Sequence, residues 1–265
     1  MQGFFIVMMK IEIKGLKELQ ESIDDHIARQ IPFIAAKSLT MTAKDLQADL
    51  KHEMTDSFDR PTPYTLNSMY IQAATKAKLE ATVGFKTFGG KGIPAGKYLL
   101  PQVFGGVRPL KRFEKALRSI GVLPSNHIVV PGSGVQLDSY GNIPRSLIVQ
   151  ILSYFKAFGE QGYRANMTDK RRKSLARGTK TKQGVSYFVS KGGVDKFAAG
   201  IWARYQFSHG SAVKPIMMFV PYPVYEQRLD FFYVMRKSAE KHFEKNLKET
   251  FGQVVGSGTS KGRRQ

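Results

Sequence analysis

Residues 98–117 read YLLPQVFGGVRPLKRFEKAL, and this stretch decides how the rest of the chain is arranged. An extended apolar run breaks at Gly105 and Gly106 and is followed, over residues 110–120, by the pattern of a basic amphipathic helix. The residues before this stretch predict one compact α+β unit. Those after it, up to about Val220, predict an elaboration of that unit, and a last helix over residues 224–251 returns to close it.

The residues before the central stretch carry strand and helix patterns in turn. Met9, Ile11 and Ile13 alternate with charged residues, which predicts a half-buried strand. Residues 16–27 then follow a helical period up to Pro32, which must either kink the helix or begin a new one. The pattern resumes as a second long helix with an apolar stripe of Ala35, Leu39, Ala43, Leu46, Leu50 and Met54. Residues 69–75 and 79–86 predict a β-hairpin that joins the first strand.

The residues after the central stretch begin with a turn-rich segment, 124–142, in which we expect a loop with at most one short strand. An amphipathic helix with Ile148, Ile151, Leu152, Phe155 and Phe158 on one side should follow and end at Gly159 or Gly162. Strands are expected over residues 185–190, 201–207 and 216–220. Pro221 and Pro223 introduce the closing helix, which Gly252 should end. Its predicted buried stripe is Phe232, Met235, Ala239, Phe243, Leu247 and Phe251.

Together these patterns predict an α+β fold in which a small, mostly antiparallel sheet is packed by long amphipathic helices, with an inserted α/β elaboration and flexible basic arms. The expected divisions are residues 1–120 for the first part of the core and 121–214 for the insertion, including a basic arm at 163–184. Residues 215–252 should supply the closing strand and helix, and 253–265 a flexible basic tail.

Composition limits the classes of function. A hydrophobic content of 42% and an aromatic content of 11% are typical of a folded chain. The absence of cysteine excludes disulfides, thiolate nucleophiles and Cys-ligated metals. No apolar run approaches the roughly 20 residues that cross a bilayer, so we expect no membrane association. Forty-one Lys and Arg against 21 Asp and Glu give a net charge of +20, which favours polyanionic partners.

The charge is concentrated in one segment, residues 164–182, with eight basic residues, one acid and a net charge of +7. Because the segment is so polar, burial of apolar surface cannot offset the entropy cost of ordering it. We therefore expect the segment to be disordered in the free subunit and ordered by a partner. The candidate partner-binding residues of this arm are Arg164, Lys170, Arg171, Arg172, Lys173, Arg177, Lys180 and Lys182. A second candidate face, on the predicted helix 110–120, carries Lys111, Arg112, Lys115 and Arg118.

No pattern in the sequence predicts catalysis, a cofactor or a metal. The five histidines are scattered, without a metal-ligand spacing. The segment GGKGIPAGK, residues 89–97, has Lys91 at the first glycine of a phosphate-binding loop and is followed by Tyr98 in place of Ser or Thr, so we expect a mobile loop there. Ser133 lacks the context of a nucleophile elbow. We therefore expect no enzyme, no catalytic residues and no cofactor.

The order of elements resembles a known family. Residues 31–54, IPFIAAKSLTMTAKDLQADLKHEM, resemble the alanine-rich and then charged helix of minor tail protein Z-like and tail-completion proteins of tailed bacteriophages. GLKEL precedes this helix, and a hairpin, YLLPQVFGG, RFEKAL and the closing PYPVYEQRLDFFYVMRKSAEKHFEKNLKETF follow it in similar order. The resemblance covers residues 9–120 and 215–252. Residues 121–214 lie outside it, and VFGG stands where the nearest relatives carry an EFGT ending.

The resemblance implies a non-enzymatic structural virion protein, a neck or tail-completion subunit assembled in the host cytoplasm. Its implied partners are further copies of itself in a ring, connector or adaptor proteins, and tail tube or tail terminator proteins, with DNA in the channel as a further candidate. Tail completion, tail termination and head–tail joining stay open as roles. The alternative is a non-catalytic DNA-binding protein that uses its basic arm to follow phosphates.

Overall fold

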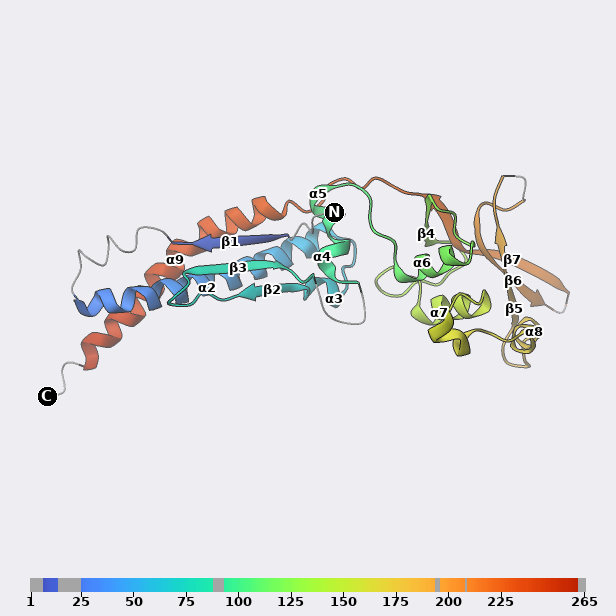
Figure 1. Ribbon diagram of the computed structural model, residues 1–265, viewed down its shortest axis with the longest axis horizontal. Helices are drawn as coiled ribbons and strands as arrows, with labels where there is room; N and C mark the ends of the chain where they lie inside the picture. The colour runs from blue at the N-terminus through green and yellow to red at the C-terminus, as the bar shows by residue number, and fades with distance from the viewer. Residues whose placement is uncertain (1–6, 14–24, 88–92, 194–195, 208, 262–265) are drawn as a thin grey trace. The chain divides into compact units, whose positions relative to one another are not determined.

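The computed structural model of the chain describes residues 7–13, 25–87, 93–193, 196–207 and 209–261 (Figure 1). Within these ranges the chain has an α+β fold with two antiparallel sheets, which confirms the predicted class. It divides into two compact units. The first comprises Met1–Gly106 with Glu226–Gln265, and the second comprises Val107–Tyr225.

The first unit contains a three-stranded antiparallel sheet in the order β1-β3-β2. The strands are β1, Met8–Glu12, β2, Met69–Gln72, and β3, Glu80–Phe85. In the central strand β3, Ala81, Val83 and Phe85 are fully buried, as their alternation predicts. The pairing of β2 and β1 with β3 confirms the predicted hairpin and its junction with the first strand.

Helix α2, Asp25–Ser57, packs along this sheet (Figure 1). Leu39, Ala43, Leu46, Leu50 and Met54 are fully buried, which confirms the apolar stripe of the sequence. Pro32 lies inside α2 and does not start a second helix. A proline inside a helix removes one backbone hydrogen bond, and α2 continues through it.

The first half of the central stretch is helical, so the expected extended run is wrong. Short helix α3, Pro63–Leu66, precedes the hairpin, and α4, Ala95–Tyr98, and α5, Leu100–Phe104, follow it. Pro101 in the first turn of α5 favours a helix start, and Leu99 and Val103 are buried in the first core. Gly105 and Gly106 then adopt φ of 72° and 93°, a conformation that favours glycine, and the chain leaves the first unit.

The closing helix α9, Phe231–Lys261, differs from the prediction at both ends. Residues before it are not helical because the backbone amides of Arg228 and Leu229 donate to the carbonyl of Gln102 instead. Asp230 then accepts from the backbone N–H of Tyr233 and caps the helix. Gly252 does not end α9, because a glycine inside a helix costs only about 1 kcal/mol and does not forbid it.

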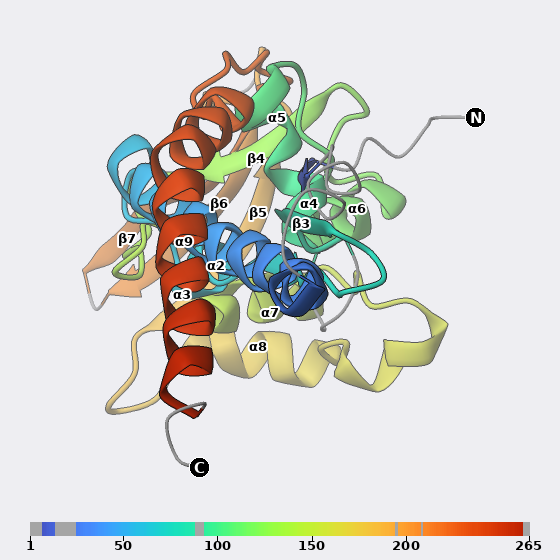
Figure 2. The same cartoon turned by 90° about the vertical axis from the view of Figure 1, so that its left-hand side faces the viewer.

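The face of α9 that packs on α2 is largely polar, so the predicted apolar stripe is partly wrong. Phe231 and Met235 are fully buried, whereas Phe232 and Phe251 are each 43% exposed. Farther along α9 the buried residues are Ser238, Asn246 and Thr250. Figure 2 shows α9 passing across α2, and this interface is a polar seam between the two helices.

Carboxylates of α2 accept several of the hydrogen bonds of this seam. The Ser238 hydroxyl donates to Asp49 at 2.6 Å, and Nε2 of His242 lies 3.0 Å from the same oxygen. The Asn246 amide donates to Asp45 at 2.7 Å and to the Thr42 hydroxyl at 3.1 Å. Burial opposes the ionisation of Asp49, but Ser238, His242 and nearby Lys241 outweigh it and lower its pKa.

The second unit is built on a four-stranded antiparallel sheet in the order β4-β7-β6-β5. The strands are β4, His127–Pro131, β5, Gly184–Ser190, β6, Gly200–Phe207, and β7, Gly210–Pro221. The predicted strands 185–190, 201–207 and 216–220 correspond to β5, β6 and the second half of β7, and β4 lies where the sequence allowed at most one short strand. The inner face shares a core with helices α6, Arg112–Ser119, α7, Arg145–Tyr154, and α8, Asp169–Arg177. The 3-10 helix η1, Glu160–Ala165, connects α7 to α8.

The predicted divisions at residues 120 and 215 are wrong. Helix α6 belongs to the second unit because Leu117 is fully buried in that unit's core, and β7 belongs there through Ile216 and Met217. Helix α7 also ends at Tyr154, before either candidate glycine, and Lys156 follows at a φ of 59°.

Several expectations fall outside the described residues. These are most of the apolar N-terminal extension, the first helical stretch around Leu16 to Ile23, the first four residues of the glycine-rich segment, 89–92, and the last four residues of the tail. Among the residues that are described, no helix has both the length and the hydropathy to cross a membrane.

Candidate partner-binding surface

The basic segment 164–182 is folded, so the expected disordered arm is wrong. Residues 169–177 form helix α8, whose N-terminus is capped by the Thr168 hydroxyl, which accepts from the backbone N–H of Arg171. Gly178, at a φ of 75°, ends the helix, and a side chain there would collide with the backbone of Gly184. A tight turn follows, in which the Thr179 hydroxyl accepts from the backbone N–H of Lys182.

The segment is held on the second unit by side chains that its charge pattern did not indicate. Met167 is buried in the core and Leu175 packs against it. The Arg172 guanidinium lies over the ring of Tyr154, with 4.5 Å between Cζ and the centroid. The backbone N–H of Met167 donates to the carbonyl of Ser153, whose hydroxyl donates to the carbonyl of Ala165. The ordering entropy is therefore offset by a small apolar face within the chain itself.

The remaining cations of the segment face solvent. Asp169, the one acid, is already engaged by Lys156 at 3.4 Å and Arg172 at 3.7 Å. In the part of the chain that the structure describes, the other cations of α8 and its following turn are exposed and have no acidic partner: Lys170, Arg171, Lys173, Arg177, Lys180 and Lys182. Arg164 is also exposed. The structure thus leaves six of the eight predicted arm residues available to an anion, and Arg172 is committed to its own unit.

The second predicted face, on α6, is only partly available. Lys111, Arg112 and Lys115 are exposed. Arg118 is not, because its guanidinium donates to the carbonyl of His127 at 2.7 Å and lies over the ring of Tyr222.

A buried ion pair beside α6 was missed by the sequence reasoning. Glu114 is fully buried and receives two hydrogen bonds from Arg108, at 2.6 and 2.8 Å, and two more from the backbone N–H groups of Lys111 and Val129. Burial opposes ionisation of the carboxyl, but these donors outweigh it and lower the pKa of Glu114. Glu114 reads as an ordinary helix-face acid in the sequence. Only the spacing of Arg108 six residues before it could have suggested the pair.

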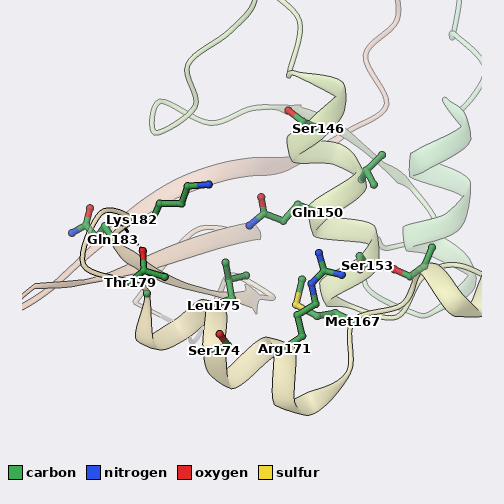
Figure 3. A pocket seen from close by; sticks show the side chains of 13 residues that line it. Ser146, Gln150, Ser153, Met167, Arg171, Ser174, Leu175, Thr179, Lys182 and Gln183 are labelled. Carbon is green, nitrogen blue, oxygen red and sulfur yellow. Dashed lines mark hydrogen bonds between the residues drawn. The ribbon is translucent and has the colours of Figure 1, made fainter.

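A groove of about 530 Å³ lies between α7 and α8, and it was also missed (Figure 3). Its wall on α7 includes Ser146, Val149 and Gln150, none of which any motif marks. Its wall on α8 includes Arg171 and Leu175, and Lys182 lies at the turn that closes one end. Gln150, Arg171, Leu175 and Lys182 extend into the space between the two helices (Figure 3). The groove therefore combines apolar surface with two exposed cations.

Within the described ranges, no group of three or more His, Cys, Asp or Glu side chains is placed to hold a metal ion. Comparisons with protein-family models, with curated proteins and with solved structures found no match to the chain.

Proposed function

We propose that the chain is a non-enzymatic structural subunit of a tailed-bacteriophage virion, a neck or tail-completion protein that joins the head connector to the tail. The observation that carries this proposal is the packing of α9 on α2. It brings together, in one unit, the larger parts of the two separated stretches on which the resemblance to the phage family rests, residues 9–106 and 226–252. Residues 107–225 are inserted between these parts as a unit with its own core, and this second unit contains RFEKAL and residues 215–225 of the resemblance.

The partners in this proposal are further copies of the chain in a ring, the connector or adaptor proteins, and the tail tube or terminator. The exposed cations of α8 and α6 support contacts with acidic surfaces, because charge complementarity accelerates association and selects partners. The subunit would be assembled in the host cytoplasm and would reside in the virion neck.

Mass photometry of the purified chain, alone and mixed with connector or tail proteins from the same phage, tests the proposal. The expected result is a closed oligomer or a stable complex with one of those proteins. A strict monomer that joins none of them would contradict it.

A second candidate is non-catalytic DNA binding, favoured by the six exposed cations of residues 170–182 that have no acidic partner among the described residues. Neutralisation of about six phosphates would give a log–log dependence of affinity on salt with a slope of roughly −5. A slope near zero for a duplex of mixed sequence would remove this candidate.

A further inference from the structure

The groove between α7 and α8 differs from the outward face of α8 although both are basic. Lys170, Lys173 and Arg177 recur on the outward face at a spacing of three and four residues, and they present charge alone. The groove adds apolar surface to charge. Val149 is 44% exposed there, and Leu175 is only partly buried.

The apolar part of the groove can receive a side chain. Val149 from α7, Leu175 from α8 and Met167 from the segment before α8 line it together. A volume of about 530 Å³ is within the range of natural ligand sites and holds a few amino-acid side chains. Covering Val149 would remove exposed apolar surface from water, which favours a ligand with an apolar group of its own.

The polar part of the groove selects an anion that also forms hydrogen bonds. Arg171 and Lys182 have no acidic partner in the described part of the chain, because Asp169 is engaged by Arg172 and Lys156. A guanidinium and an ammonium both bind carboxylates by charge-assisted hydrogen bonds. The amide of Gln150 and the hydroxyl of Ser174 line the same groove and can pair with a peptide backbone.

A duplex fits this groove poorly. Its phosphate backbone offers no apolar group to cover Val149 and Leu175, and a double helix is too wide to enter so small a groove. Stacking of unpaired bases would need aromatic side chains, and the described groove lining contains none. The outward face of α8, with its evenly spaced cations, would be the better surface for DNA.

We propose that the groove between α7 and α8 binds an acidic, amphipathic peptide segment of a partner protein. An apolar side chain of the peptide packs on Val149 and Leu175, and its carboxylates pair with Arg171 and Lys182. The source of the peptide, a neighbouring virion subunit, rests on the proposed function, whereas the chemistry of the groove does not.

Fluorescence anisotropy with the full chain tests this proposal. The probes are a labelled synthetic peptide of about ten residues containing Glu, Asp and Leu, the same peptide with Gln and Asn in place of the acids, and a labelled 20-base-pair duplex. The groove variant is R171S/K182S, and K170S/K173S is the matched control with the same change of charge. A third variant, Val149→Ser, removes apolar surface and keeps every charge. Circular dichroism establishes that each variant is folded.

We expect the groove variant to weaken binding of the acidic peptide at least tenfold and the outward variant to weaken it less than threefold. Val149→Ser should weaken peptide binding severalfold and leave duplex binding unchanged. The peptide without acids should bind at least tenfold more weakly than the acidic one.

Three results would overturn the proposal. The first is an equal loss of peptide binding in the two charge variants. The second is a duplex that binds the chain more tightly than the peptide does, with duplex binding lost in the groove variant. The third is the absence of detectable peptide binding by the unaltered chain. Because the probes are synthetic, these results are independent of whether the chain is a virion protein.

Discussion

The carboxylate of Glu114 is fully buried in the second unit, and the guanidinium of Arg108, itself 14% exposed, balances its charge. Glu114→Gln keeps the shape of the side chain but leaves Arg108 without its anion. Breaking a buried pair on one side costs about 3–5 kcal/mol. We expect a loss of that order in the free energy of unfolding of the second unit, measured in urea.

Trp202 provides the readout for this experiment, because it is the one tryptophan of the chain and lies on β6 in the second unit. Its fluorescence follows the unfolding of that unit. Glu244→Gln is the matched control, since Glu244 pairs with Lys248 on an exposed face of α9 and its loss should leave the Trp202 transition unchanged. An equal effect of the two variants would refute the structural role of the buried pair.

The same pair should make the second unit sensitive to acid. The pKa of Glu114 in the folded chain lies below its ordinary value of 4.5. The ionised pair therefore stabilises the folded unit above that pH, and this contribution is lost as the pH falls through the lower, folded value. The urea concentration at the midpoint of the Trp202 transition should decrease as the pH is lowered below about 4.5. This decrease should be less steep in Glu114→Gln. Parallel pH profiles for the two proteins would contradict this assignment.

Helix α9 offers a contrast between two adjacent phenylalanines. Phe231 is fully buried, and its ring lies 5.5 Å from that of Phe85, whereas Phe232 is 43% exposed. Phe231→Ala should lower the free energy of unfolding by about 3–5 kcal/mol through a cavity in the first core. Phe232→Ala should cost clearly less. Urea unfolding followed by far-ultraviolet circular dichroism measures both, and equal losses would mean that α9 is rotated from the position described.

Helices α2 and α9 show where sequence patterns were sufficient to predict the buried face of a helix and where they were not. The stripe of α2 was predictable because Leu39, Ala43 and Leu46 face a sheet and are apolar at every turn. Helix α9 faces another helix through Ser238, His242 and Asn246, so its buried face carries polar residues that an apolar count assigns to solvent. Helix α9 begins later than predicted because the capping residue Asp230, and not the two prolines, determines where it starts.

The sequence predicted which charges the candidate site carries, but it did not predict how the site is arranged in space. Composition identified the cations of residues 164–182 correctly as exposed, apart from Arg172. It could not identify α8 as folded, because two apolar contacts, Met167 and Leu175, are enough to anchor a short helix to a core that lies elsewhere in the sequence. The groove depends on Val149 and Gln150 of α7, which only the tertiary structure brings beside α8.

For the molecule as a whole, the chain supplies two units, each with its own core, and the second is inserted between the segments that build the first. This arrangement is economical for a structural subunit, because one unit can hold a common assembly position while the other carries variable contacts. In the proposed role, the cations of α8 and the groove beside it would supply these contacts on the second unit.

Quantitative mass spectrometry tests the proposed structural role most directly, and its sample is purified, salt-washed particles of a phage whose genome carries this sequence, as we propose. We expect the chain to be retained in intact particles, in copy numbers close to those of connector or tail-terminator proteins and far below those of the capsid protein. Absence of the chain from washed particles that keep their heads, necks and tails would contradict it.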